Sequence, residues 1–396
     1  MSWYKWIGQT THKKHVQGIM LASSQNDIQH KLTERHIKLI YACTCATPQR
    51  PFSREVKSAL CHTLSNLLEA GIQLQEALEL TAQTINHPFC KAILEEASTQ
   101  LKAGREFSTT LQAHRHLFDE VMLTLIAAGE VSAALVPALN ALTHFYTMQE
   151  NFIKKTKAAL FLPCITFSLF IMITVLLFLF FIPRFETLFL STEKPIPWYT
   201  QTLFTISHFI QSWYGICSAV AIGVIVTLLY TFRSHPVCRH YLERILLHIP
   251  VARSFIWYSQ LSFFFQTLGI LLSNNIHLVP SMHVAIKAIR IKAIQSEMNP
   301  ILHDIESGQD LPSAWQARLS FLSPALHALI TLGQKTGNMG SMIIKAALWT
   351  TQEVHHTLSL LQTYIPVFAL CLLALLIGSL IIIVYIPLLS LSHTLM

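Results

Sequence analysis

Two hydrophobic patterns alternate along this chain of 396 residues. In the stretch 53–157, apolar residues recur every three or four positions, for example from Leu60 to Leu68, and nothing alternates as a half-buried strand would. Three further stretches are almost wholly apolar, and each is long enough for the ~20 residues that cross a bilayer core: 158–182, 209–232 and 364–390. The pattern predicts an all-α membrane protein with helical bundles and three transmembrane helices.

Capping and helix-breaking residues divide the first bundle into short helices. Ser53 can cap a helix that runs to Glu69, and Gly71 and Gly104 each follow the end of a predicted helix. The predicted helices are 53–69, 74–85, 88–103, 108–114, 119–128 and a long one that starts near 136 and continues into the first apolar stretch. Residues 1–50 differ, and they could form a small N-terminal module that is either mixed in structure or partly mobile.

The bundle pattern occurs twice. Thr63-Leu64-x-x-Leu67-Leu68 lines up with Thr267-Leu268-x-x-Leu271-Leu272, and Leu125-Ile126-x-x-Gly129-Glu130-x-Ser132 lines up without a gap with Leu329-Ile330-x-x-Gly333-Gln334-x-Thr336. Every aligned pair of residues is separated by the same number of positions as Thr63 and Thr267. This constant separation is called the repeat offset below. A constant register over so long a stretch is not expected by chance. Because both copies are too long and too charged to lie in lipid, we predict two duplicated helical domains outside the membrane.

The distribution of charge predicts the orientation of these parts. Only 12% of the residues are charged, against roughly 25% in an ordinary soluble domain. Of the 28 Lys and Arg residues, 16 lie in 1–157, two in 184–205 and ten in 233–365. Since Lys and Arg collect on the cytoplasmic side of a membrane, the N-terminus and both copies are predicted to be cytoplasmic. The net charge of +7 then reflects topology, and nucleic-acid binding is not expected.

These observations predict the following organisation: an N-terminal cytoplasmic module (1–50), a first cytoplasmic repeat (53–157), transmembrane helix 1 (158–182), a periplasmic loop (183–208), transmembrane helix 2 (209–232), a second cytoplasmic repeat (233–363), transmembrane helix 3 (364–390) and a periplasmic C-terminus (391–396). The two repeats are called the first copy and the second copy below.

Motifs of common enzymes are absent from the sequence. There is no Gly-x-x-x-x-Gly-Lys-Ser/Thr loop for nucleotide phosphates, no His-Glu-x-x-His and no Gly-x-Ser-x-Gly. The eight cysteines and twenty histidines form no set of ligands at metal-binding spacing. We therefore expect a protein that is not an enzyme, without catalytic residues, metal or cofactor.

Several strings carry a resemblance to a known family. A Gly-Glu-x-Ser/Thr element stands at Gly129, Glu130 and Ser132 and again, altered, at Gly333, Gln334, Thr336 and Gly337. Further signature residues belong to the spans and the loop between them: Pro163, Pro183, Pro197, Thr200, Pro366, Tyr385 and Pro387. With the placement of the three spans, these strings resemble the type II secretion F family, the polytopic inner-membrane platform proteins of type IV pilus and type II secretion machines.

The resemblance covers essentially the whole chain and implies a platform without catalytic activity in the bacterial inner membrane. Trp6-Ile7-Gly8 and the string Gly18–Ala22 look more like the pilus branch. The implied partners are a hexameric assembly or retraction ATPase, pilin or pseudopilin subunits, other inner-membrane assembly proteins, membrane lipid and further copies of the chain. The alternatives are the equivalent platform of a type II secretion system and, more distantly, a repeat-built membrane transporter. The scarcity of ionisable residues in the spans disfavours the transporter.

Departures from the family pattern concern the duplicated element. Ala133 stands where the family usually has glycine, and Gln334 stands where it usually has glutamate, so only Glu130 remains of the acidic pair. Gly129 lets another backbone approach closely, and the following carboxylate could then reach a helix N-terminus, a basic partner or a cation. Either Glu130 satisfies local donors at a tight corner, or the corner faces a partner or the other copy.

Overall fold

Helices begin and end in the first copy where side chains can satisfy their free backbone groups. The computed structural model describes residues 2–10, 15–22, 24–34, 37–46, 51–190, 198–212, 250–319 and 323–392. The Ser53 hydroxyl accepts a hydrogen bond from the Val56 amide, and the Asp119 carboxylate accepts one from the Met122 amide. The helices of this part are α2 (Arg54–Glu69), α3 (Leu74–Thr84), α4 (Pro88–Lys102), α5 (Phe107–Ala113), α6 (Glu120–Val131) and α7 (Leu135–Leu176).

The second copy repeats these helices in the register that the sequence predicts. Its helices are α12 (Pro250–Ser273), α13 (Leu278–Ala288), α14 (Lys292–Glu306), α15 (Leu311–Arg318), α16 (Pro324–Lys335) and α17 (Met339–Ser392). Both ends of α13, α14 and α16 follow the corresponding ends of α3, α4 and α6 by the repeat offset. The predicted fold class, two duplicated helical bundles with long apolar helices, is confirmed.

The turns between helices keep the same register. Left-handed backbone occurs at three pairs of positions that are each separated by the repeat offset: Gly71 and Asn275, Gly104 and Gly308, and Ala133 and Gly337. Such a conformation ends a helix and costs an L-residue about 1–2 kcal/mol relative to glycine. The backbone path is therefore preserved even where one copy has lost the glycine.

The N-terminal module is mixed, which is one of the two alternatives that the sequence left open. It contains β1 (Ser2–Thr10), β2 (His15–Ala22), α1 (Gln25–Glu34) and β3 (Ile37–Cys45). The three strands are antiparallel in the order β2-β1-β3. Trp6 packs with Ile28 and Leu32 of α1 in a small core, while Trp3 contacts Phe89 of α4 at 5.1 Å between ring centroids. The sheet is thereby attached to the first copy.

The hydrophobic core of the first copy extends to the second copy. The main core cluster consists chiefly of buried residues of α2 to α7, and it also includes Ile270, Leu271 and Val284 from α12 and α13. The chain divides into two compact units, and the first one contains the module, the first copy up to Ile153 and most of the second copy, Gln260–Arg290 and Ile294–Thr350. The copies therefore pack as parts of a single unit.

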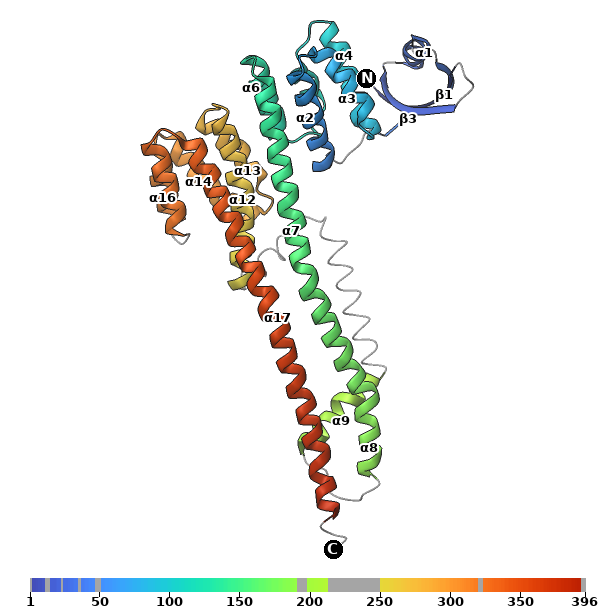
Figure 1. Cartoon of the computed structure of the whole chain (residues 1–396), viewed down its shortest axis with the longest axis vertical. Coiled ribbons are helices and arrows are strands. Elements are labelled where there is room, and N and C mark those ends of the chain that lie inside the picture. The colour runs from blue at the N-terminus through green and yellow to red at the C-terminus, as the bar shows by residue number, and fades with distance from the viewer. Residues whose placement is uncertain are drawn as a thin grey trace. The chain divides into compact units, whose positions relative to one another are not determined.

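The second unit consists of Lys154–Ser259, Ile291–Ala293 and Thr351–Met396. In its described part, α7 continues into a π-helical segment η1 (Leu177–Phe181), followed by α8 (Ile182–Leu190) and α9 (Trp198–Gln211). Figure 1 shows α7 and α17 as long continuous helices that leave their respective copies.

Three described helical runs are long and apolar enough to cross a membrane: Leu135–Arg184, Arg253–Ser273 and Met339–Ser379. In the most apolar window of each, 11%, 72% and 0% of the residues are buried. The high burial of Arg253–Ser273 indicates a core helix of the second copy, whereas the other two runs expose apolar side chains. Leu135–Arg184 contains predicted transmembrane helix 1, and Met339–Ser379 overlaps the first part of predicted transmembrane helix 3. Predicted transmembrane helix 2, 209–232, lies outside the described residues beyond position 212.

Candidate functional site

Gly129 lies where α6 approaches the start of α7. A Cβ atom added there would come within 2.8 Å of Ala138 Cβ and 3.2 Å of the Ala134 carbonyl oxygen. Any larger side chain would push the two helices apart. Gly129, Glu130 and Ser132 are called the first corner below.

The Glu130 carboxylate caps the N-terminus of α5. Its Oε1 accepts a hydrogen bond from the Phe107 amide (2.7 Å), and its Oε2 accepts one from the Ser108 amide (2.8 Å). The first amides of a helix have no partner within the helix, and the helix dipole favours a negative charge there. Each hydrogen bond to a charged group contributes about 1.5–3 kcal/mol. The contact therefore holds α5 against the end of α6.

The second corner, formed by Gly333, Gln334, Thr336 and Gly337, keeps the geometry and changes the chemistry. A Cβ atom added to Gly333 would lie 3.0 Å from Met342 Cβ. The counterparts of Phe107 and Ser108, one repeat offset later, are Leu311 and Pro312. Proline has no amide hydrogen, so one of the two donors that hold Glu130 has no counterpart here. This loss gives a physical reason for glutamine at 334, whose side chain is exposed.

The two helix ends at the corners are closed alike. Ser132 Oγ donates to the Ala128 carbonyl (2.7 Å), and its counterpart Thr336 donates through Oγ1 to the Leu332 carbonyl (2.8 Å). The amides of Ala133 and Gly337 donate to the carbonyls of residues 130 and 334, each at 3.3 Å. Hydroxyl residues are thus used at both corners to satisfy the last carbonyls of a helix.

Pro163 lies inside α7, where it leaves a carbonyl without its helical donor. The missing amide would have donated to the Ala159 carbonyl, four residues earlier. Gln362 of α17 supplies the replacement, because its Nε2 donates to the Ala159 oxygen at 2.8 Å. Lipid offers no hydrogen bonds, so this contact joins the two helices where a free carbonyl would be costly.

Pro183 is accommodated in the same way. The Ile182 amide donates to the Leu177 carbonyl, five residues earlier, in the π-helical pattern. The next such bond would run from position 183 to the Phe178 carbonyl, but proline cannot donate it. Ser207 Oγ (2.8 Å) and Gln211 Nε2 (3.3 Å), both on α9, donate to that oxygen instead.

The remaining signature residues do not join these sites. Thr200 lies in α9, and Pro366, Tyr385 and Pro387 lie within the bounds of α17, which continues past each proline. Pro197 lies outside the described residues. His208 of α9 contacts Glu186 of α8, with 2.9 Å between Nε2 and Oε1.

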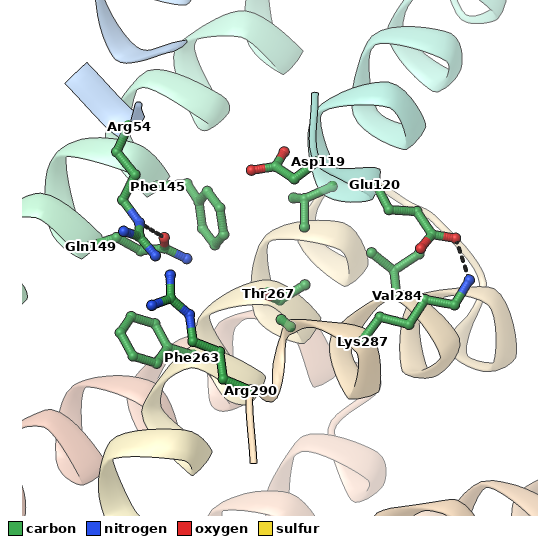
Figure 2. A pocket seen from close by; sticks show the side chains of 12 residues that line it. Arg54, Asp119, Glu120, Phe145, Gln149, Phe263, Thr267, Val284, Lys287 and Arg290 are labelled. Carbon is green, nitrogen blue, oxygen red and sulfur yellow. Dashed lines mark hydrogen bonds and ion pairs between the residues drawn. The ribbon is translucent and has the colours of Figure 1, made fainter. Parts of the chain in front are cut away.

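A polar cavity of about 270 Å³ lies between the two copies. Figure 2 shows Arg54 and Gln149 of the first copy facing Arg290 of the second. Arg54 Nε donates to Gln149 Oε1 (2.8 Å), and Lys287 Nζ lies 2.7 Å from Glu120 Oε1. Burial and the nearby Arg290 lower the pKa of Arg54. The cavity therefore brings a partly buried arginine of the first copy close to an exposed arginine of the second.

Asp119 at the edge of this cavity is fully engaged with neighbouring donors. Its Oδ2 lies 3.0 Å from Lys57 Nζ, and its Oδ1 accepts from the Tyr146 hydroxyl and the Met122 amide. Burial, followed by the charge of Asp119, raises the pKa of Tyr146, so the phenol stays protonated and can donate.

Metal ligands and reactive thiols are two kinds of group that enzymes use in catalysis. No group of three or more His, Cys, Asp or Glu residues that could hold a metal occurs in the described ranges. Cys90 is buried, and burial raises the pKa of its thiol to about 12, which keeps it protonated and weakly nucleophilic.

Sequence reasoning missed the polar partners that come from distant segments. Gln362, Ser207 and Gln211 answer prolines in another helix, and Arg54 and Arg290 meet across the copies. One feature of the sequence could have indicated these contacts. A glutamine or serine near a proline-containing span can donate to the carbonyl that the proline leaves without its helical donor. Nothing in the spacing indicates which residue does it.

Comparisons with known proteins identify relatives over most of the chain. A family model described as "Type II secretion system (T2SS), protein F" matches residues 60–183 and 264–387, so both bounds of the second match follow those of the first by the repeat offset. The chain is 25% identical over 328 residues to the type IV pilus assembly protein PilC of Myxococcus xanthus, an alignment that covers 83% of this chain and 78% of that protein.

Two further relatives represent the pilus branch and the secretion branch, respectively. The type IV pilus assembly protein TapC of Aeromonas hydrophila is 22% identical over 396 residues, 98% of this chain and 95% of that protein. The type II secretion system protein F of Vibrio cholerae is 22% identical over 345 residues, 84% of each.

Proposed function

The chain belongs to the type II secretion system protein F family, and from this membership we propose that it is the inner-membrane platform of a type IV pilus assembly machine. The observation that carries the proposal is the double family match in the predicted register. The alignment with TapC extends the similarity to a pilus assembly protein over 98% of the chain. The platform role itself is common to the family.

In this proposal both copies and the N-terminal module are cytoplasmic. The exclusion of Lys and Arg from the spans and their excess in 1–157 and 233–365 support this orientation. Transmembrane helices 158–182, 209–232 and 364–390 then place the loop 183–208 and the C-terminus in the periplasm.

The platform acts without catalysis of its own and receives energy from a partner. The sequence has no phosphate-binding loop, yet moving subunits out of a bilayer requires work. We infer that a hexameric cytoplasmic ATPase engages the two copies and that the membrane helices guide pilin subunits, with further copies of the chain and other inner-membrane proteins completing the assembly. Val131, 87% exposed beside Glu130, gives the first corner an apolar surface for such a contact.

Glu130 serves this function by positioning α5. Its two hydrogen bonds to the Phe107 and Ser108 amides occupy both carboxylate oxygens. We therefore favour a structural role for the carboxylate itself, and a partner-facing role for the exposed residues around it.

A secretion platform is the second candidate, because the protein F of Vibrio cholerae aligns over 84% of the chain. A transporter is disfavoured, since transporter repeats lie within the membrane, whereas much of each repeat here forms a helical bundle, and buried residues of the second bundle join the core of the first.

Deletion of the gene, followed by separate assays for surface pili and for secreted enzymes, distinguishes the two branches. We expect pili to disappear and secretion to persist, with recovery on complementation by the intact gene. Loss of secretion with normal pili would assign the chain to the secretion branch. Loss of neither would contradict the platform proposal.

Reporter fusions test the orientation independently. Fusions after Lys157 and Val251 should report a cytoplasmic position, and fusions at Lys194 and after Met396 an external one. An external signal at Val251 would contradict the three-span topology. Hydrolysis of ATP by the purified chain would contradict a non-catalytic platform.

A further inference from the structure

The cavity between the copies is built from residues that the family signature does not include. Its walls come from α2, α6 and α7 of the first copy and from α12, α13 and the residues after α13 in the second. Anything bound there would touch both copies at once. Its lining includes Arg54 and Glu120 of the first copy and Thr267, Lys287 and Arg290 of the second.

Two arginine side chains face each other across this space, and a lysine on the same lining is paired with a glutamate. Figure 2 shows the guanidinium groups of Arg54 and Arg290 pointing toward one another from opposite copies, with Lys287 further along the same wall. Glu120 is held by Lys287 at 2.7 Å, and the oxygens of Asp119 are occupied by Lys57, Tyr146 and the Met122 amide. The two carboxylates on the wall are thus already in use.

The approach of two guanidinium groups is unfavourable by itself. Arg54 is partly buried, and its removal from water strengthens its repulsion from the exposed Arg290. The lowered pKa of Arg54, caused by burial and then by Arg290, reflects this arrangement. An anion placed between the two groups would turn the repulsion into attraction, because each guanidinium can donate two parallel hydrogen bonds to phosphate oxygens.

A neutral donor also lines the cavity. Thr267 is fully buried, and its hydroxyl has no hydrogen-bond partner among the described residues. A buried hydroxyl without a partner is costly, and most such groups in proteins are satisfied. A ligand oxygen in the cavity would give it one.

We propose that this cavity is a binding site for a phosphate group, held by Arg54 and Arg290 from opposite copies with Thr267 as a further donor. The volume of about 270 Å³ lies just below the ~300–1,000 Å³ that is typical for drug-sized ligands. It therefore suits inorganic phosphate, pyrophosphate or the terminal phosphate of a nucleotide better than a whole nucleotide. Because the ligand touches both copies, binding favours the packed arrangement of the copies.

Calorimetric titration of the purified full-length protein in detergent tests the proposal. The probes are inorganic phosphate, pyrophosphate and ATP, each at an ionic strength held constant with sodium chloride, and the melting temperature is measured in parallel. We expect saturable phosphate binding and a melting temperature that rises with phosphate. Tighter binding of ATP through the same arginines would assign the site to a nucleotide phosphate, and binding of phosphate and pyrophosphate alone would assign it to the free anion.

Variants separate this site from general anion binding. Arg54→Gln and Arg290→Gln should each weaken phosphate binding at least tenfold, and Thr267→Val about threefold. Arg105→Gln and Arg318→Gln change arginines elsewhere in the two copies and should leave the dissociation constant within twofold. Arg290→Lys keeps the charge but loses the planar donor pair, so its effect should lie between those of the wild type and Arg290→Gln.

Two results would overturn the proposal. One is a wild-type protein that shows no response to phosphate beyond that to chloride. The other is equal binding by the wild type and the Arg54→Gln/Arg290→Gln double variant, which would indicate an adventitious ion only. Folding of each variant is checked by circular dichroism, and the wild-type titration decides the matter even if a variant fails to fold.

Discussion

At the first corner, the Glu130 carboxylate caps the start of α5. At the second corner, Gln334 carries a neutral amide side chain, and Pro312 at the start of α15 stands where the first copy has a donor. The helix ends at the two corners otherwise correspond residue by residue, including the left-handed positions Ala133 and Gly337. Glu130 is held by two amides, and Pro312 removes one of those amides in the second copy.

This difference shows how duplicated domains diverge. The backbone path is fixed by the packing of α6 against α7 and of α16 against α17, so the close-approach glycines Gly129 and Gly333 remain. A side chain that serves only one hydrogen-bonding task can change once its donor is lost. We therefore interpret the asymmetry of Glu130 and Gln334 as a consequence of local capping.

The largest expected effect is that of Glu130→Ala. It leaves the Phe107 and Ser108 amides without their charged acceptor, which should destabilise α5 locally by about 3 kcal/mol. Hydrogen exchange of the full-length protein in detergent should then show the α5 amides exchanging roughly 100-fold faster. Glu130→Gln, which keeps one acceptor oxygen, should have a smaller effect.

Gln334→Ala is the matched control for this comparison. Its side chain is exposed, so exchange in α15 should change less than about threefold. Equal acceleration of hydrogen exchange in α5 and in α15 by the two alanine variants would show that the corners are equivalent. It would contradict a capping role that is specific to Glu130.

Gly129→Ala comes next in size. The new methyl group would lie 2.8 Å from Ala138 Cβ, which cannot move aside as a flexible side chain can, and overpacking of this kind costs about 1–3 kcal/mol. Gly333→Ala meets Met342 Cβ at 3.0 Å and the adaptable Met339 sulfur at 3.1 Å. The melting temperature should fall more for Gly129→Ala, and the opposite order would mean that the first corner can relax.

Local features of the sequence predicted most of the fold. Ser53 and Asp119 begin helices, Gly104 ends one, and the apolar spacing placed six helices within a few residues of their observed bounds. The strands of the N-terminal module were left open, because short strands acquire their partners only through pairing with distant segments.

The candidate sites could be predicted only in part for the same reason. Glycine at 129 indicated a close approach, which the structure contains. The donors to Glu130 are backbone amides and therefore have no sequence signature. Gln362 meets Ala159 from a distant part of the sequence, and no periodicity or motif connects them.

Gln362→Leu should have a moderate effect and tests how the membrane prolines are accommodated. It removes the donor to the Ala159 carbonyl, and a single polar contact between membrane helices contributes about 0.6 kcal/mol on average. In Pro163→Ala, the new alanine amide can donate to the Ala159 carbonyl within α7. Gln362 should then be dispensable.

The matching double-variant experiment compares Gln362→Leu in the wild type and in Pro163→Ala. The loss of melting temperature should be present in the first background and absent in the second, while Gln352→Leu on the same helix should have no effect in either. An equal loss in both backgrounds would show that Gln362 stabilises the protein by another contact.

The smallest effect concerns pH and again separates the copies. His87 caps α4 by accepting a hydrogen bond from the Cys90 amide through Nδ1, and its counterpart in the second copy, position 291, is isoleucine. Burial lowers the pKa of His87, so the folded state favours the neutral ring. The stabilisation by His87 is complete above the unfolded pKa of about 6.5. It is lost as the pH falls through the lower folded value, where protonation also removes the acceptor.

Between pH 7.5 and pH 5.5, His87→Asn, which keeps a capping oxygen, should reduce the fall in melting temperature by about 1–2 °C. An unchanged pH dependence in His87→Asn would show that other groups govern the acid sensitivity of the first copy.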